Sequence, residues 1–260
     1  MTGYYIDCSA RHAIAAIDLV ADSMQNIKFE PSEFQRELSV VRQELADGMV
    51  SRQRVQWKLL KQTLYLLHPV RHPIIGYLDV LDRTTNQTII DFYRERYVPN
   101  NQVFVVVGDV VTQDVLDEVA RQWVGTGRGR ETFVPLPDEP EQLTPREAFQ
   151  EMDGSTYDIV VAWPTVKLSH PDLYALDVAA YILAEGESSR MVRRLKYERQ
   201  LVLSVSSGSF TPGFVKGYFA IMASAQPEHW QEASEEILSD VYRLRDALVS
   251  PAELATTVRR

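Results

Sequence analysis

One stretch in the middle of the chain limits the folds that this sequence can adopt. Residues 126–146 hold four prolines and two glycines among many charged side chains. Proline lacks the backbone N–H that helices and sheet interiors need, and this composition is typical of a linker that crosses a protein surface. We therefore predict a first domain at residues 1–128, a linker at residues 129–146 and a second domain at residues 147–260.

The first half combines helices with two apolar strands. Apolar side chains recur at helical spacing within residues 12–26, which predicts an amphipathic helix. An uninterrupted apolar run within residues 102–109 predicts a buried strand. The other elements predicted for this half are a strand at residues 4–8 and helices at residues 32–48, 55–67, 84–98 and 112–125.

The second half repeats the mixture in a different order. A Thr-Pro-Gly turn at residues 211–213 separates two apolar segments, residues 201–210 and 216–226, and this arrangement predicts a β-hairpin. The remaining elements are strands at residues 147–152 and 157–166 and helices at residues 172–186, 188–200 and 228–248. The fold class is therefore α+β, with two related domains that each pack helices on one side of an antiparallel-rich sheet.

Composition and charge narrow the functional classes. The 260 residues are 45% hydrophobic with a net charge of −9, which suits globular domains and argues against non-specific binding to nucleic acid or anionic membranes. The single cysteine, Cys8, excludes an intrachain disulfide framework, and no apolar run is long enough for a membrane span. Both ends of the sequence read as the middle of an element, so we expect a fragment of a longer protein.

Two glutamates in the helix predicted after residue 31 are candidates for chemistry. Glu37 and Glu44 lie seven residues apart, and therefore fall on nearly the same face of a helix, with two valines between them. A buried carboxylate is costly unless it is paired, protonated or bound to a metal. The alternative is that both face solvent or pair with an arginine such as Arg36 or Arg42, and spacing alone favours this alternative.

The pattern of the histidines indicates a structural role and not a zinc site. His68 and His72 have the spacing that places two imidazoles on one helical face for zinc, but Pro69 and Pro73 prevent a regular helix there. We therefore expect a structural loop. No GxSxG, phosphate-binding loop, GxGxxG or CxxC motif occurs in the sequence.

Four short motifs, taken together and in order, resemble the insulinase/pitrilysin metallopeptidases. They span residues 34–45 (FQRELSVVRQEL), 68–76 (HPVRHPIIG), 97–109 (YVPNNQVFVVVGD) and 182–195 (ILAEGESSRMVRRL). The resemblance covers essentially the whole chain, whereas each motif alone is a weak match. An unrelated α+β protein is the alternative without this resemblance.

The resemblance implies a zinc-dependent endopeptidase whose two halves close around a peptide substrate. Members of this family hold zinc with two histidines of an inverted HxxEH motif and with a downstream glutamate, which matches Glu44. Glu37 matches an acidic residue beside that ligand, where it would orient a ligand or the attacking water. We expect Glu44 to face inward on a helix that lines a cleft. No HxxEH occurs in these residues, so we expect the fragment to bind no zinc and to be inactive.

The second half departs from the family pattern as well. Many members carry an arginine and a tyrosine that bind the substrate, and the matching positions here are Lys196 and Leu203. A retained Glu44 without that pair implies a zinc-bearing subunit whose partner is a homologous chain with the Arg/Tyr pair. The alternative function is a non-catalytic homologue that serves as a binding or assembly subunit of a heteromeric complex.

Overall fold

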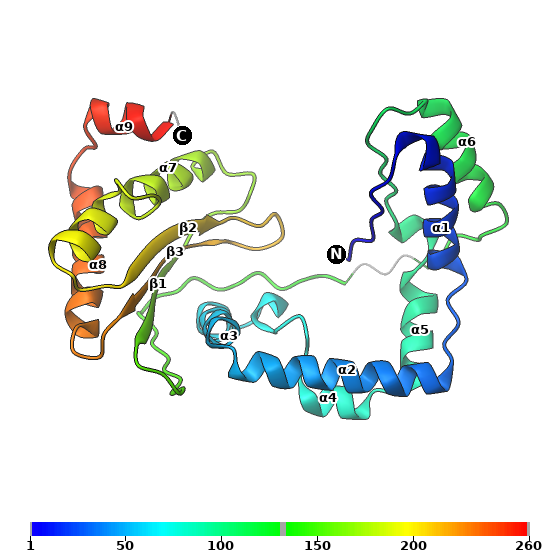
Figure 1. Ribbon diagram of the computed structural model, residues 1–260, viewed down its shortest axis with the longest axis horizontal. Coiled ribbons are helices and arrows are strands. Elements are labelled where there is room, and N and C mark those ends of the chain that lie inside the picture. Colours follow the sequence, from blue (N-terminus) through cyan, green and yellow to red (C-terminus); the bar gives the residue numbers. More distant parts are fainter. Residues whose placement is uncertain (1, 131–133, 259–260) are drawn as a thin grey trace. The chain divides into compact units, whose positions relative to one another are not determined.

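The computed structural model describes residues 2–130 and 134–258 and has the predicted α+β class (Figure 1). Residues 131–133 of the predicted linker lie outside the described residues. The α-helices are α1 (Ala13–Gln25), α2 (Pro31–Val50), α3 (Arg52–Leu64), α4 (Leu78–Arg83), α5 (Asn86–Arg96), α6 (Thr112–Gln122), α7 (Leu173–Leu183), α8 (Trp230–Asp246) and α9 (Pro251–Val258). Short 3-10 helices are η1 (Ala10–His12), η2 (Pro69–Arg71) and η3 (Pro99–Asn101), and η4 (Val192–Glu198) is a π-helix. The strands are β1 (Tyr157–Pro164), β2 (Ser204–Phe210) and β3 (Tyr218–Ala225).

The chain forms two compact units whose limits differ from those read off the sequence. Unit 1 contains residues 1–45 and 75–135, and unit 2 contains residues 46–74 and 136–260. The division of the sequence into domains at residues 1–128 and 147–260 stays a prediction. What the structure adds is that α3 and the loop after it pack with the second half of the chain. No helix in the described part of the chain is long and apolar enough to cross a membrane.

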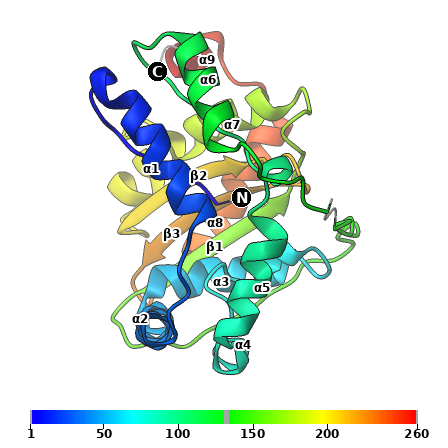
Figure 2. The same cartoon turned by 90° about the vertical axis from the view of Figure 1, so that its right-hand side faces the viewer.

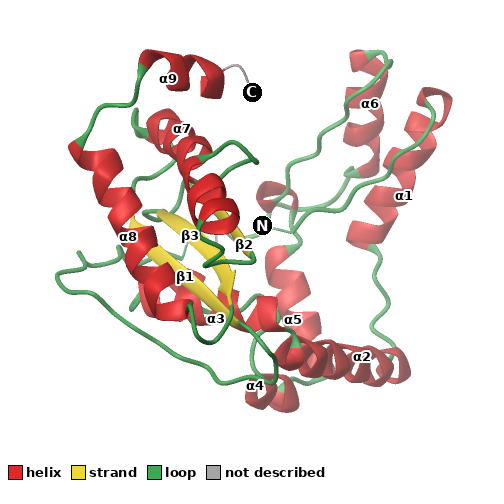
Figure 3. Cartoon of the chain, turned by 60° about the vertical axis from the view of Figure 1, so that its left-hand side comes forward, coloured by secondary structure: helices red, strands yellow, loops and turns green. Residues whose placement is uncertain are grey.

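Unit 2 is built on an antiparallel sheet with the strand order β1-β3-β2. The predicted hairpin is confirmed, because β2 pairs with β3 in antiparallel register from Ser204 opposite Ser224 to Phe210 opposite Tyr218. Gly217 is required where the hairpin returns, since a Cβ atom there would lie 1.9 Å from the carbonyl oxygen of Phe210. Figure 3 shows all the described strands in this unit.

One face of the sheet carries the main hydrophobic core. Alternate residues of β3, such as Phe219 and Ile221, point to this face and pack against α7, η4 and α8 (Figure 3). The largest side chains that are fully buried here are Leu183, Met191, Leu195, Ile221 and Ile237. Ser207 on β2 donates a hydrogen bond to the carbonyl oxygen of Ala180, which fixes α7 on the same face.

The other face of the sheet is covered by α3, which the sequence places far away in the first half. Tyr218 and Ala220 of β3 form a second core with Leu60 and Tyr65 from α3 and the residue that follows it. Arg52 in the first turn of α3 forms an ion pair of 2.8 Å with Asp158 on β1. Helices therefore lie on both faces of this sheet, whereas the sequence predicted helices on one side only.

Unit 1 is held together by helix packing. α1 lies beside α6 (Figures 1 and 3), and Gln122 donates a hydrogen bond of 2.6 Å to Asp18 between them. The Tyr93 hydroxyl on α5 donates to the carbonyl oxygen of Met24 at the end of α1. Figure 2 views α2 along its axis and shows α5 following α4. Arg42 of α2 and Asp82 of α4 form an ion pair of 3.0 Å.

The strands predicted at residues 4–8, 102–109 and 147–152 are wrong, because these residues form no strand. Residues 102–107 still alternate as a strand would. Their even-numbered side chains are partly buried, with Phe104 against Trp123, while Val103, Val105 and Val107 are exposed. A strand needs a hydrogen-bonded neighbour, and the described residues provide none here. Residues 4–8 and 102–109 line an apolar cavity of about 1090 Å³ in unit 1.

The two-sided sheet predicts where truncation is costly. Ile221→Ala removes a side chain with no exposed surface from the centre of β3, so we expect the free energy of unfolding to fall by about 2–5 kcal/mol. Leu248→Ala truncates a fully exposed side chain and should change it by less than about 0.5 kcal/mol. Urea denaturation followed by circular dichroism measures both. Equal effects of the two substitutions would contradict this assignment of the core.

Candidate functional site

The two candidate carboxylates lie on α2, a helix with one buried stripe. Leu38 and Leu45 are buried, whereas Glu37 and Glu44, one residue before each of them, are exposed. The expectation that Glu44 faces inward is therefore not met within the described residues. The helical period explains this, because a residue next to a buried one is turned by about 100° around the helix axis. The assignment of Glu44 and Glu37 to a zinc centre stays a prediction.

The arginines near these glutamates have other partners. Arg36 pairs with Glu33 one turn earlier, and Arg42 pairs with Asp82 on α4. The alternative that Arg36 or Arg42 neutralises Glu37 or Glu44 is therefore not what the structure shows. Both carboxylates are accessible on the exposed side of α2, which is the other form of the alternative, the one in which both glutamates face solvent.

The described residues do not fit a zinc ion by themselves. Among residues 2–130 and 134–258, no three His, Cys, Asp or Glu side chains come together in a group that could hold a metal. A catalytic zinc takes three protein ligands and keeps a fourth position open. Glu44 offers one carboxylate, so no step of a metal-dependent reaction can be assigned to these residues alone.

The two substrate-binding positions predicted in the second half lie near η4. Lys196 belongs to this π-helix, and its amine lies 5.1 Å from the centre of the Tyr197 ring. Leu203 is half exposed just before β2, and its N–H donates to the carbonyl oxygen of Ser224. Gln200 between them has a φ of 53°, in the left-handed region that residues with a side chain rarely adopt. Such unusual backbone and π-helical turns are enriched at functional sites.

An ion-pair network fixes η4 to α8. Arg194 lies 2.7 Å from the carboxylate of Asp240, which is buried, and also pairs with Glu236. Hydrogen bonds from Arg194 and Arg199 hold the pKa of Glu236 below its usual value. Charges in a partly buried network are stabilised by each other, so removing one partner leaves an uncompensated charge. The network therefore positions the turn that carries Lys196.

The loop predicted around His68 and His72 is confirmed. His68 precedes the 3-10 helix η2, and its Nδ1 atom accepts a hydrogen bond of 3.1 Å from the N–H of Val70. Its side chain is only 3% exposed and stacks on Phe214. Burial lowers the pKa of His68. The imidazole thus has a structural role in which the neutral form is favoured.

The sequence did not single out the residue that fastens this loop. The carboxylate of Glu139 accepts hydrogen bonds of 2.5, 3.0 and 2.9 Å from the N–H groups of Leu66, Leu67 and His68. Although burial opposes it, these bonds hold the pKa of Glu139 below its usual value. Arg146 donates to the carbonyl oxygens of Thr63 and Leu64 at the end of α3. The only signal in the sequence was the presence of charged residues within a proline-rich segment.

Comparison with known proteins now identifies the family. The family model described as Peptidase M16 inactive domain matches residues 83–260, and the model described as Insulinase (Peptidase family M16) matches residues 1–77. The chain belongs to the insulinase family of peptidases, family M16. The predicted resemblance is confirmed.

Three similar proteins illustrate the range of this family. The zinc protease PqqE of Helicobacter pylori is 26% identical over 265 residues, which cover 98% of this chain and 58% of that protein. A solved structure of a protease from Helicobacter pylori superposes with a TM-score of 0.88 at 25% identity, over 96% of this chain and 62% of that chain. Mitochondrial cytochrome b-c1 complex subunit 1 of Bos taurus is 25% identical over 184 residues, or 70% of this chain and 38% of that protein. The chain thus spans less than two thirds of the length of these relatives.

The buried imidazole predicts a pH dependence of stability. In the unfolded chain His68 takes up a proton near its usual pKa of 6.5, whereas the folded state resists protonation. The free energy of unfolding should therefore be highest above pH 6.5 and fall as the pH decreases below 6.5. His68→Asn keeps an acceptor for the N–H of Val70 but does not titrate, so this loss should become smaller.

A matched control is present in the same unit. The Nδ1 atom of His170 also accepts from the N–H of the residue two positions later, Asp172, and lies 3.7 Å from its carboxylate, but the side chain of His170 is exposed. His170→Asn should change the free energy of unfolding by less than about 0.5 kcal/mol, because the side chain is exposed. Urea denaturation at several pH values measures both variants. A His68→Asn protein with the pH dependence of the wild type would contradict the burial argument.

Proposed function

We propose that this chain is the glutamate-bearing part of a zinc-dependent endopeptidase that cleaves peptides. The observation that carries the proposal is the segment FQRELSVVRQEL, in which Glu44 matches the zinc-ligand glutamate of the family; the exposure of Glu44 differs from what is expected of a ligand and does not support it. Family membership and the similarity to a zinc protease support the same class of protein.

The other zinc ligands must come from residues outside this sequence. In the proposed site, two histidines of an HxxEH motif would join Glu44, and no such motif occurs in the 260 residues. When bound, a zinc ion in such a site lowers the pKa of a bound water and polarises a carbonyl group. The 260 residues would contribute one ligand, so by themselves they should neither retain zinc nor hydrolyse peptides.

Glu37 has a supporting role in this proposal. It lies two helical turns before Glu44 on the same exposed side of α2. A carboxylate in this position would orient a ligand or a water through a hydrogen bond, and loss of such partners typically costs about 10–100-fold in metal affinity or activity.

Substitution of Glu44 tests the assignment in a protein that includes the HxxEH segment. Glu44→Gln removes the charge of the proposed ligand, so we expect loss of bound zinc and a fall in peptide hydrolysis of at least about 100-fold, which corresponds to about 2.7 kcal/mol in the barrier. Metal analysis and a fluorescent peptide assay, each with and without a chelator, measure the two effects.

The control removes a charge from the same helix. Glu33 lies one turn before Glu37 and pairs with Arg36, so Glu33→Gln should leave zinc content and hydrolysis unchanged. Hydrolysis that a chelator does not affect would overturn the zinc mechanism. Normal zinc content in Glu44→Gln would overturn the ligand assignment.

The second candidate is a non-catalytic subunit of a heteromeric complex. The similarity to a subunit of the cytochrome b-c1 complex supports it, as does the description of the matching model as an inactive domain. The reading frame upstream of residue 1 discriminates the two candidates. An HxxEH motif there supports the endopeptidase, and its absence from a complete reading frame supports the assembly subunit.

Lys196 and Leu203 lead us to propose that the full-length protein works with a homologous partner subunit. An ammonium group replaces the planar, bidentate guanidinium of the family's arginine, and the leucine has no hydroxyl. We therefore expect the full-length protein to co-purify with a homologue that carries the Arg/Tyr pair, and to cleave peptides only in its presence. Affinity purification followed by mass spectrometry and an activity assay tests this. Full activity of the isolated chain would contradict it.

A further inference from the structure

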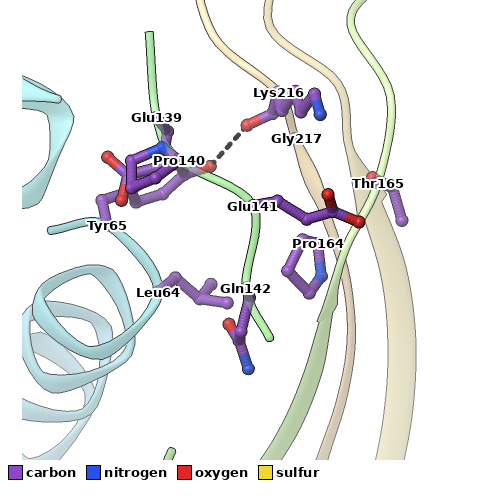
Figure 4. Close-up of a pocket in the computed structure, with 10 residues that line it drawn as sticks. All are labelled: Leu64, Tyr65, Glu139, Pro140, Glu141, Gln142, Pro164, Thr165, Lys216 and Gly217. Carbon is purple, nitrogen blue, oxygen red and sulfur yellow. Dashed lines mark hydrogen bonds between the residues drawn. The ribbon is translucent and has the colours of Figure 1, made fainter. Parts of the chain in front are cut away.

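A small pocket in unit 2 lies beneath the second part of the linker. Figure 4 shows residues 139–142 passing between the end of α3 and the end of β1. The pocket has a volume of about 240 Å³. This is several times the roughly 30 Å³ that a water molecule occupies in the liquid, so a planar polar group of a few heavy atoms fits.

The walls of the pocket are fixed by hydrogen bonds. Glu139 is held by the three N–H groups of residues 66–68, and Arg146 holds the other end of the same segment against α3. On the opposite side, the hydroxyl of Tyr65 donates to the carbonyl oxygen of Lys216 at 2.9 Å (Figure 4). Thr165 donates its N–H to Gly217 at 2.8 Å. A pocket with such walls is organised before a ligand arrives.

Two oxygen atoms in this pocket lack partners. The side-chain oxygens Oε1 of Gln142 and Oγ1 of Thr165 are buried and have no hydrogen-bond partner among the described residues. Buried acceptors without a donor are costly, and most of those in folded proteins are satisfied by protein, water or a ligand. Both atoms can accept a hydrogen bond from a bound group, and the hydroxyl of Thr165 can also donate one.

One carboxylate of the lining is open to a cationic donor. Glu141 extends toward Thr165 and Pro164 in Figure 4 and forms no ion pair within the described ranges. Lys216 forms no ion pair with Glu139 or Glu141 in the same part of the chain. The carboxylate of Glu139 already accepts three N–H groups, so the free charges of the lining are the carboxylate of Glu141 and the ammonium group of Lys216, and a cation in the pocket would bind at Glu141.

The shape of the lining favours a flat cation. Pro140, Pro164, Leu64 and the ring of Tyr65 provide apolar surfaces on several sides of the pocket. A guanidinium group has five donors in one plane, is weakly hydrated and stacks on flat surfaces, whereas an ammonium group is compact and strongly hydrated.

We propose that this pocket binds a guanidinium group. Glu141 supplies the charge-assisted contact, and Gln142 and Thr165 accept the remaining N–H donors. The group comes from an arginine side chain of a peptide or from a small arginine derivative, which share this chemistry. The proposal does not depend on zinc or on peptidase activity.

Binding to the full chain tests the proposal, with Nα-acetyl-arginine amide as the probe. The isosteric citrulline amide has no charge, and the lysine amide has an ammonium group. In a titration followed by NMR, the arginine probe should bind at least about tenfold more tightly than either, a difference of about 1.4 kcal/mol. Equal binding of the three probes, or no binding of the arginine probe, would overturn the proposal.

Variants of the lining locate the site. Glu141→Gln and Thr165→Val should each weaken binding of the arginine probe by about tenfold, because each removes an acceptor from a charged donor. Thr165→Val keeps the shape of a side chain whose hydroxyl has no partner among the described residues, so its melting temperature should not fall. Glu151→Gln removes an exposed charge from the same unit and should leave binding unchanged. Unchanged binding in Glu141→Gln would place the ligand elsewhere and reject the pocket.

A peptide arm identifies the source of the group. Acetyl-Gly-Gly-Arg-Gly-Gly-amide should bind at least as tightly as the single residue if the natural ligand is a peptide. Weaker binding of the peptide would assign the pocket to a small arginine derivative. Both results uphold the guanidinium chemistry and depend on the same Glu141.

Discussion

The second unit depends on the burial of both faces of β3. Phe219 and Ile221 alternate with Tyr218 and Ala220, and the two sets belong to two different hydrophobic cores. A strand of this kind is stable only when another layer covers each face, because exposed apolar surface on either side would oppose folding. α7, α8 and η4 cover one face and α3 covers the other. The second half of the chain therefore requires a helix from the first half.

This requirement gives α2 a particular position in the chain. The limit between the two units falls within this helix, after Leu45, so Glu44 lies next to the point where the chain passes from one unit to the other.

The sequence predicted the helices well and the first-half strands badly, for one physical reason. A helix satisfies its own backbone hydrogen bonds, so the periodicity within residues 12–26 or 228–248 is sufficient evidence for it. A strand needs a neighbour, and residues 102–107 show strand-like alternation without a partner among the described residues. The position of Glu44 on a helix followed from local pattern, and spacing alone also favoured its exposure. The inward orientation was expected from the family resemblance, and the described residues do not show it.

The linker shows the same limit of local pattern. Four prolines predicted an irregular surface segment, and composition alone gave no reason to expect fixed geometry. Glu139 and Arg146 nevertheless use the unpaired N–H and C=O groups at the end of α3 and in the loop that follows. Helix ends leave such groups without partners, and a charged side chain that satisfies them holds its own backbone in place. Residues 139–146 are therefore part of the wall of unit 2, and the acceptors that they bring to the pocket have fixed positions instead of the freedom of a flexible connection.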